Sequence, residues 1–180
     1  MINNTAIAVA LDEAGGFAKN FVTPWKDKPF YKKDLKRFKD LTNGHIVVMG
    51  RHTYEEIHEG KVNRGLRENG PLLWGRTSFV LSRNEDFNPH GAKRIGWLRG
   101  VMYEDEAMVK DKVQTLFVIG GEKVFWEFLP YTKDVYCTIV KGYYDCDKFF
   151  PITELTKKFV IKDGVETDDT YFVHYERIMR

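Results

Sequence analysis

Short runs of apolar and β-branched residues recur along the chain, separated by segments whose apolar positions repeat with helical spacing. The runs at residues 5–11, 46–49, 78–81, 115–119 and 135–140 predict strands. Most are continuous rather than alternating, as expected for strands that are covered on both faces. Helical patterns occupy residues 30–41, 53 to about 58, 104–109 and 122–129. The succession predicts an α/β fold with a mostly parallel central sheet and flanking helices.

Three further segments depart from this succession. Residues 171–178 alternate in part and predict a longer strand near the end of the chain. Residues 12–28, with Gly15-Gly16 and Pro24-Trp25, and the glycine-rich residues 59–73 predict long loops. Loops of this length within a compact domain are often functional.

Composition and charge are those of an ordinary globular domain. With 180 residues, 43% hydrophobic and 30% charged, the chain is expected to form one domain, residues 1–180. A net charge of +2 is too balanced to indicate a nucleic-acid partner. The two cysteines, Cys137 and Cys146, match no zinc spacing, so no metal site is expected, and they favour a reducing compartment. Without a signal peptide or a membrane-length apolar segment, we expect a soluble cytoplasmic monomer or homodimer.

One carboxylate lies on the apolar face of a predicted helix. Asp34 is the only charged residue in an arc about 120° wide, which it shares with Tyr31, Leu35, Phe38, Leu41 and Thr42. A carboxylate on a buried face is costly unless it is paired, and such a group often marks a site. The alternative is that Asp34 only favours the helix dipole. Because no basic residue shares its arc, a cationic or hydrogen-bond-donating ligand could be its partner.

Two glycine-marked turns follow predicted strands. Gly50-Arg51-His52-Thr53 begins a helix whose first turn would present amide groups and partial positive charge to a phosphate, or it is simply a tight turn. Gly120-Gly121 lets a ligand approach the backbone closely and permits rare geometries, including a cis bond. Since ligands bind at the carboxyl ends of strands in α/β sheets, the two turns indicate an extended ligand such as a dinucleotide. The G-x-G-x-x-G fingerprint is absent.

A third basic element, Ser82-Arg83, follows the predicted strand 78–81. A hydroxyl and a guanidinium at this place could hold a second phosphate, which would favour NADPH over NADH. Surface Ser-Arg pairs are common, so this pair gains meaning only from its context.

In their order and spacing, these segments resemble the dihydrofolate reductase family over residues 6–180. The similarity is carried by Thr23-Pro24-Trp25 and by residues 34–39, 48–55, 75–76, 81–83, 118–121, 128–130, 136–139 and 147–151. The resemblance implies a single-domain fold with an antiparallel C-terminal strand. It implies reduction of 7,8-dihydrofolate to 5,6,7,8-tetrahydrofolate with NADPH as cofactor. Dihydrofolate and antifolate-type small molecules are the ligands it implies.

The resemblance also implies roles for matched positions. Asp34 would orient the pterin and promote protonation from water, supported by Thr138. The substrate would contact Ala6, Leu35, Phe38, Ile57, Leu73, Arg76 and Ile119, and Arg76 would clamp its glutamate carboxylate. The cofactor would contact Ala8, Gly16, Phe17, Ala18, Lys19, Gly50, Arg51, His52, Thr53, Leu81, Ser82, Arg83, Gly120, Gly121, Glu122, Lys123, Val124 and Phe125.

The chain departs from the family pattern at several positions. Ala18 stands where a glycine is usual, Phe125 where many members have Tyr, and residues 58–70 look like an insertion beside the glutamate-binding region. Two other functions remain open: a riboflavin-pathway-type pyrimidine reductase of the same fold, and a non-catalytic relative that binds NADPH or a partner. Asp34 with Thr138 favours the folate branch over the first, and Asp34 with the turn at Gly50 speaks against the second.

Overall fold

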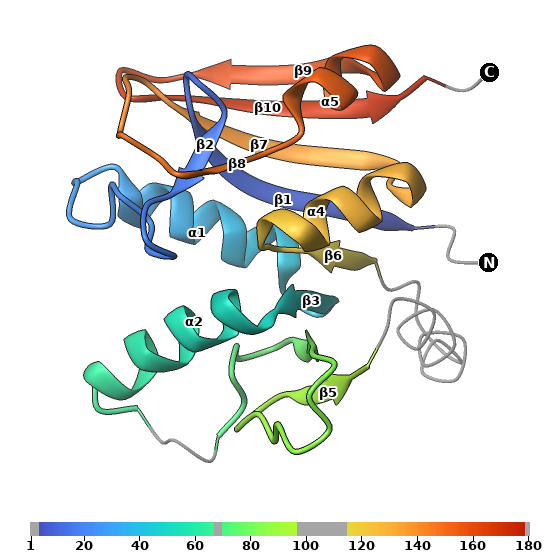
Figure 1. The fold of residues 1–180 in the computed structure, drawn as a ribbon. Helices are drawn as coiled ribbons and strands as arrows, with labels where there is room; N and C mark the ends of the chain where they lie inside the picture. The colour runs from blue at the N-terminus through green and yellow to red at the C-terminus, as the bar shows by residue number, and fades with distance from the viewer. Residues whose placement is uncertain (1–3, 67–69, 97–114, 179–180) are drawn as a thin grey trace.

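The computed structural model describes residues 4–66, 70–96 and 115–178. Its centre is an eight-stranded sheet in the order β5-β4-β3-β6-β1-β7-β10-β9, with β9 at the top and β5 at the bottom of Figure 1. The strands from β5 to β7 in this order are parallel, whereas β10 is antiparallel to both β7 and β9. The strands are β1 (Thr5–Asp12), β3 (Ile46–Gly50), β4 (Thr77–Leu81), β5 (Lys93–Ile95), β6 (Leu116–Val118), β7 (Asp134–Val140), β9 (Phe159–Glu166) and β10 (Thr170–Arg177).

Helices cover both faces of the sheet, which explains the continuous apolar runs. In β3, Val48 packs into a core formed with α4 (Glu122–Phe128), the 3₁₀ turn η1 (Leu129–Tyr131) and α5 (Ile152–Lys158). Its neighbours Val47 and Met49 pack into the core on the opposite face, under α1 (Tyr31–Thr42) and α2 (Arg51–Asn63). All three side chains are fully buried. Successive strand residues point to opposite faces, so both sets must be apolar.

The predicted fold class is confirmed, and each strand predicted from an apolar run is present to within one residue at its ends. The helices predicted at 30–41 and 122–129 correspond to α1 and α4. The helix predicted at 104–109 lies outside the described residues.

Two predicted boundaries are wrong. Helix α2 continues to Asn63, so the segment expected to be a loop from residue 59 begins as helix. The last turn is held by Lys61, which is 3% exposed and donates from Nζ to the Gly70 carbonyl at 2.8 Å. This tertiary contact outweighs the low helix propensity of Gly60. The loop expected at 12–28 contains the short strand β2 (Gly16–Ala18), which pairs with β8 (Lys148–Phe149).

Besides β2, the sequence did not predict β5, β8, β9, α5 or the 3₁₀ turn η1. The edge strand β9 is exposed at every residue after Phe159, and an irregularity in its pairing lies opposite His174 and Tyr175. Exposed edge strands lack the apolar pattern of inner strands, and bulges with charged residues are usual there.

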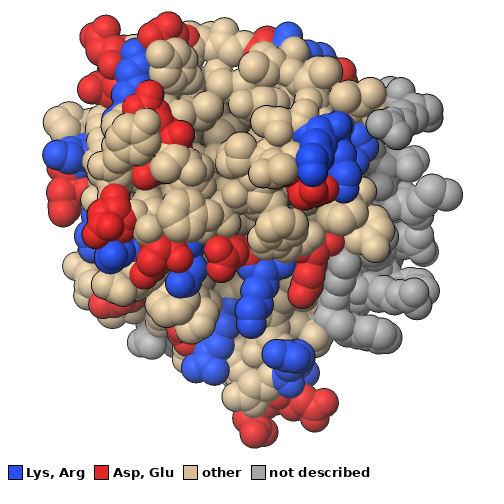
Figure 2. Space-filling view, turned by 45° about the horizontal axis from the view of Figure 1, so that its top comes forward, with Lys and Arg blue, Asp and Glu red and all other residues tan. Residues whose placement is uncertain are grey.

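The surface carries charges of both signs. On the face in Figure 2, Lys and Arg are interspersed with Asp and Glu, in agreement with the net charge of +2. None of the helices in the described ranges is long and apolar enough to cross a membrane.

Candidate active site

A cleft of about 1850 Å³ opens at the carboxyl ends of the inner parallel strands. It is lined by the turn after β3, the segment after β4, the turn after β6, and the inner faces of α1 and α2. Single-ligand pockets are usually about 300–1,000 Å³. The cleft is therefore large enough for two ligands side by side.

The two glycine turns meet at one end of this cleft. The Gly50 amide donates to the Gly120 carbonyl at 2.7 Å, and the Gly120–Gly121 peptide bond is cis. A Cβ atom at Gly50 would lie 3.1 Å from Val124 Cγ2, and one at Gly120 would lie 3.0 Å from Thr53 Oγ1. A side chain at either position would press on these neighbours, whereas glycine leaves the backbone of both turns uncrowded. The structure thus brings together the two segments that the sequence singled out for phosphate binding.

Basic residues line the same cleft as the glycine turns. The Arg51 Nε atom lies 2.6 Å from Glu55 Oε1, and its guanidinium stands 5.0 Å from the centre of the Phe87 ring. Ser82 and Arg83 line the same cleft as Arg51. Arg94 of β5, which sequence analysis did not identify, donates from Nη1 to the Ser82 carbonyl at 3.1 Å. This hydrogen bond ties the backbone of the Ser82-Arg83 pair to β5.

At the other end of the cleft, Asp34 lies on the buried face of α1 with 9% exposure. Burial raises the pKa of its carboxyl group, while a hydrogen bond with Thr138 and the charge of Arg37 act to lower it. Thr138 is 2% exposed and comes from β7. The arrangement keeps an ionisable group in a poorly hydrated place, which is typical of functional sites.

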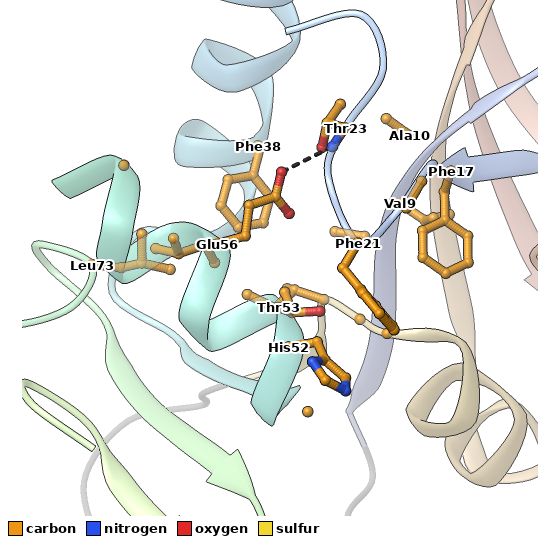
Figure 3. A pocket seen from close by; sticks show the side chains of 18 of the residues that line it. Val9, Ala10, Phe17, Phe21, Thr23, Phe38, His52, Thr53, Glu56 and Leu73 are labelled. Atoms are coloured by element: carbon orange, nitrogen blue, oxygen red, sulfur yellow. Dashed lines mark hydrogen bonds between the residues drawn. The ribbon is translucent and has the colours of Figure 1, made fainter. Parts of the chain in front are cut away.

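Apolar side chains line the space beside Asp34. Leu35 is 41% exposed although it belongs to the apolar face of α1, because that face looks into the cleft rather than into the core. Phe38, Ile57 and Leu73 line the cleft with it, and all three pack against the core under α1 and α2; Phe38 and Leu73 are labelled in Figure 3.

Arg76 lies at the outer end of this apolar wall. Its Nη1 donates to Thr42 Oγ1 at 3.1 Å, its Nε donates to the Trp74 carbonyl at 3.1 Å, and its guanidinium lies 5.6 Å from the centre of the Phe38 ring. Burial lowers the pKa of Arg76. These contacts hold the guanidinium in one place, as recognition of a carboxylate requires.

The segment before α1 touches α2 twice across the cleft. Figure 3 shows Glu56 pointing toward Thr23, whose amide donates to Glu56 Oε1 at 2.9 Å. The Phe21 ring is stacked on His52, with the ring centres 4.1 Å apart. Trp25 follows in the same segment and is fully buried, and its Nε1 has no hydrogen-bond partner among the described residues.

Most residues that the resemblance assigned to ligands line this one cleft. Three are not among the lining residues: Ala6, which is buried in the core, Gly16, which packs against Cys146, and Lys19, which forms an ion pair with Asp145 at 3.1 Å. Sequence analysis gave no role to several described residues that line the cleft, namely Trp25, Tyr31, Arg37, Glu56 and Tyr136. Trp25 belonged to the motif Thr23-Pro24-Trp25 and could have been found. The others depend on contacts between distant elements.

Metal ligands are not grouped in this cleft. No cluster of three or more His, Cys, Asp or Glu side chains suited to a metal occurs in the described ranges.

Comparison with known proteins identifies relatives of similar length. The family model for dihydrofolate reductase matches residues 5–177. A dihydrofolate reductase of Staphylococcus haemolyticus is 27% identical and aligned over 96% of this chain and 95% of its own. The type 8 dihydrofolate reductase of Escherichia coli is 31% identical, and the alignment covers 91% of this chain and 90% of that protein. A solved structure of the Enterococcus faecalis dihydrofolate reductase, complexed with NADP(H) and RAB-propyl, has a TM-score of 0.76 and 27% identity over 98% and 97%.

The sheet flanked by helices, with its ligand cleft at the carboxyl ends of the parallel strands, defines a single-domain α/β oxidoreductase. The matches cover nearly the whole chain. This chain belongs to the dihydrofolate reductase family. The family match favours dihydrofolate reductase over the pyrimidine reductase that the sequence left open.

Proposed function

We propose that this protein catalyses the reduction of 7,8-dihydrofolate to 5,6,7,8-tetrahydrofolate by NADPH. The observation that carries the proposal is the buried carboxylate of Asp34 in the same cleft as the paired glycine turns. The carboxylate suits a pterin, which presents an amino group and a ring nitrogen as hydrogen-bond donors. The glycine turns suit the phosphates of a dinucleotide.

The residues at the glycine turns fit NADPH. The backbone of Gly50 and Gly120 lacks the Cβ atoms that would fill the space beside Val124 and Thr53. We propose that the amide groups at the start of α2 hold a phosphate, and that Arg51, Ser82 and Arg83 hold the 2′-phosphate. When bound, NADPH supplies the hydride.

The chain's own contribution is position and electrostatics. We propose that Asp34 accepts hydrogen bonds from the pterin and stabilises the positive charge that develops as the imine nitrogen gains its proton. The proton is proposed to come from water. The unpartnered Nε1 of Trp25, which also belongs to the cleft lining, could hold such a molecule. Antifolate-type inhibitors are proposed to bind in the same half of the cleft.

The proposal is tested by mixing the purified protein with NADPH and dihydrofolate and following the loss of nicotinamide absorbance. Turnover that yields tetrahydrofolate supports it. A folded protein that binds NADPH but does not reduce dihydrofolate would contradict it.

Replacement of Arg76 by Leu is expected to raise the KM for dihydrofolate by about 30- to 150-fold, because a hydrogen-bonded charge pair contributes about 2–3 kcal/mol. A dihydropterin that lacks the glutamate tail is the matched control, and its kinetics should change less than about twofold. Equal losses with both substrates would show that Arg76 only supports the wall around Phe38.

Replacement of Arg83 by Ala is expected to raise the KM for NADPH by about tenfold and to leave the KM for NADH unchanged, since only NADPH carries the 2′-phosphate. Arg83 is exposed, so the variant should keep its thermal stability. Steady-state kinetics with the two cofactors measure the effect. A similar rise in both KM values would place Arg83 elsewhere in the cofactor site.

A further inference from the structure

Arg37 reaches the pterin end of the cleft although its position on the helical wheel lies outside the apolar arc of α1. Its guanidinium stands 4.7 Å from the centre of the Phe172 ring on β10, and its Nη1 donates to Thr138 Oγ1 at 3.3 Å. Phe172 and Thr138 are paired neighbours on β10 and β7. The aromatic ring and the hydroxyl therefore fix the guanidinium on the sheet beside Asp34.

The chemistry of these groups gives the hydrogen bonds a direction. An arginine side chain only donates, so the Thr138 oxygen must be the acceptor of the Arg37 hydrogen bond. The hydroxyl then has its single proton left, and an ionised carboxylate only accepts. Thr138 and Asp34 are both buried and line the same cleft, and hydrogen bonding by Thr138 acts to lower the pKa of the Asp34 carboxyl group. The hydrogen bond from Arg37 therefore leaves the Thr138 proton as the one that this hydroxyl can offer to Asp34.

We propose that Arg37 is a positioning residue of the pterin site, which orients the Thr138 hydroxyl so that its proton points at Asp34. The inference deepens the proposed function, because the oriented carboxylate is the group to which we assign the pterin. Arg37 acts through Thr138 and through its charge, and it is not proposed to touch the substrate.

The charges around Arg37 agree with this role. Burial lowers the pKa of Arg37, whereas the carboxylates of Asp34 and Asp163 act to raise it, Asp34 more than Asp163. The charge of Arg37 in turn acts to lower the pKa of Asp34.

Two further side chains complete the charged surroundings. On β10, the Nδ1 atom of His174 lies 3.1 Å from Oδ2 of Asp163, and the imidazole ring is stacked on the ring of Tyr136. On α1, the pKa of Tyr31 is raised by burial, then by Glu56 and by Asp34. None of these groups donates to Thr138 in place of Arg37.

The test is the titration of the Asp34 carboxyl group by carbon NMR in the protein without substrate or cofactor, assigned with Asp34→Asn. Arg37→Gln is expected to raise the titration midpoint by about one pH unit, the scale of one charge pair near a surface. Lys36→Gln is the matched control. Lys36 lies on the same helix with 76% of its side chain exposed, and its loss should shift the midpoint by less than about 0.2. An unchanged midpoint in Arg37→Gln would overturn the inference.

A double-mutant cycle separates orientation from simple charge. In a Thr138→Val background, Arg37→Gln is expected to shift the Asp34 midpoint by clearly less than it does in the wild type. Equal shifts would overturn the orienting role. If Arg37→Gln does not fold, Arg37→Met, which keeps a long unbranched side chain without the charge, takes the place of Arg37→Gln in the cycle.

Kinetics provide the second readout. The midpoint that Asp34 imposes on the pH profile of kcat/KM should move upward with the NMR midpoint in Arg37→Gln, and Arg37→Lys should restore most of the wild-type profile. A profile that stays in place while the NMR midpoint moves would overturn the role in the reaction. Absence of turnover in the wild type would contradict the proposed function but not the NMR result.

Discussion

Asp34→Asn is expected to lower kcat for dihydrofolate by about 10²- to 10³-fold, the usual cost of removing one preorganised electrostatic group. The amide has nearly the shape of the carboxylate but no negative charge to stabilise the protonated pterin. The Kd for NADPH should stay within about twofold, because the glycine turns lie at the other end of the cleft. Stopped-flow or steady-state assays measure kcat, and fluorescence titration measures the Kd for NADPH. Unchanged turnover would remove Asp34 from the mechanism.

The same variant is expected to be more stable than the wild type at neutral pH. Burial raises the pKa of Asp34, so the folded state binds a proton more tightly than the unfolded chain. The wild type therefore loses stability as the pH rises through the unfolded and then the folded pKa, and the loss is complete above the folded value. Asn, which carries no charge, should recover the stability that the wild type loses there. Thermal unfolding should show the difference vanishing below the unfolded pKa of Asp34; a gain that persists in acid would contradict this cause.

Gly120→Ala is expected to have the second large effect, a loss of about 2–3 kcal/mol in stability and at least about tenfold in NADPH affinity. Gly120 has φ +133°, a conformation that residues with a side chain resist, and its Cβ would stand 3.0 Å from Thr53 Oγ1. Calorimetry and cofactor titration measure the two losses.

Gly121→Ala is the matched control for stability. Gly121 has φ −89°, and its Cβ would lie 3.5 Å from the nearest atom, Thr53 Oγ1, which is an ordinary contact. This variant should cost less than about 1 kcal/mol. Equal costs for the two variants would show that conformation at Gly120 is not the cause.

The inner part of the fold could be predicted because its physical signal is strong. Strands covered on both faces must be apolar throughout, and β3 shows this with Val47, Val48 and Met49 divided between two cores. The edge was not predictable in this way. In β9 only Phe159 is buried, so its remaining residues carry no pattern that distinguishes a strand from a loop.

The residues of the candidate site were likewise predictable only in part. Asp34 stood out from its helix because a carboxylate on an apolar face is anomalous, and glycines after strands stood out because few residues permit such turns. Arg37 and Glu56 could not be found in this way. Both are charged residues on helices, and their partners Thr138 and Thr23 come from segments far along the chain. Long side chains can reach places that their position on a helical wheel does not suggest.

Helix α2 brings both halves of the cleft into one rigid element. It begins at the proposed phosphate site, its Ile57 lines the pterin side, and His52 and Glu56 hold the segment that crosses the opening. A ligand that shifts this helix at one half changes the other half with it. By thermodynamic linkage, the factor by which NADPH alters the affinity for dihydrofolate must equal the factor by which dihydrofolate alters the affinity for NADPH.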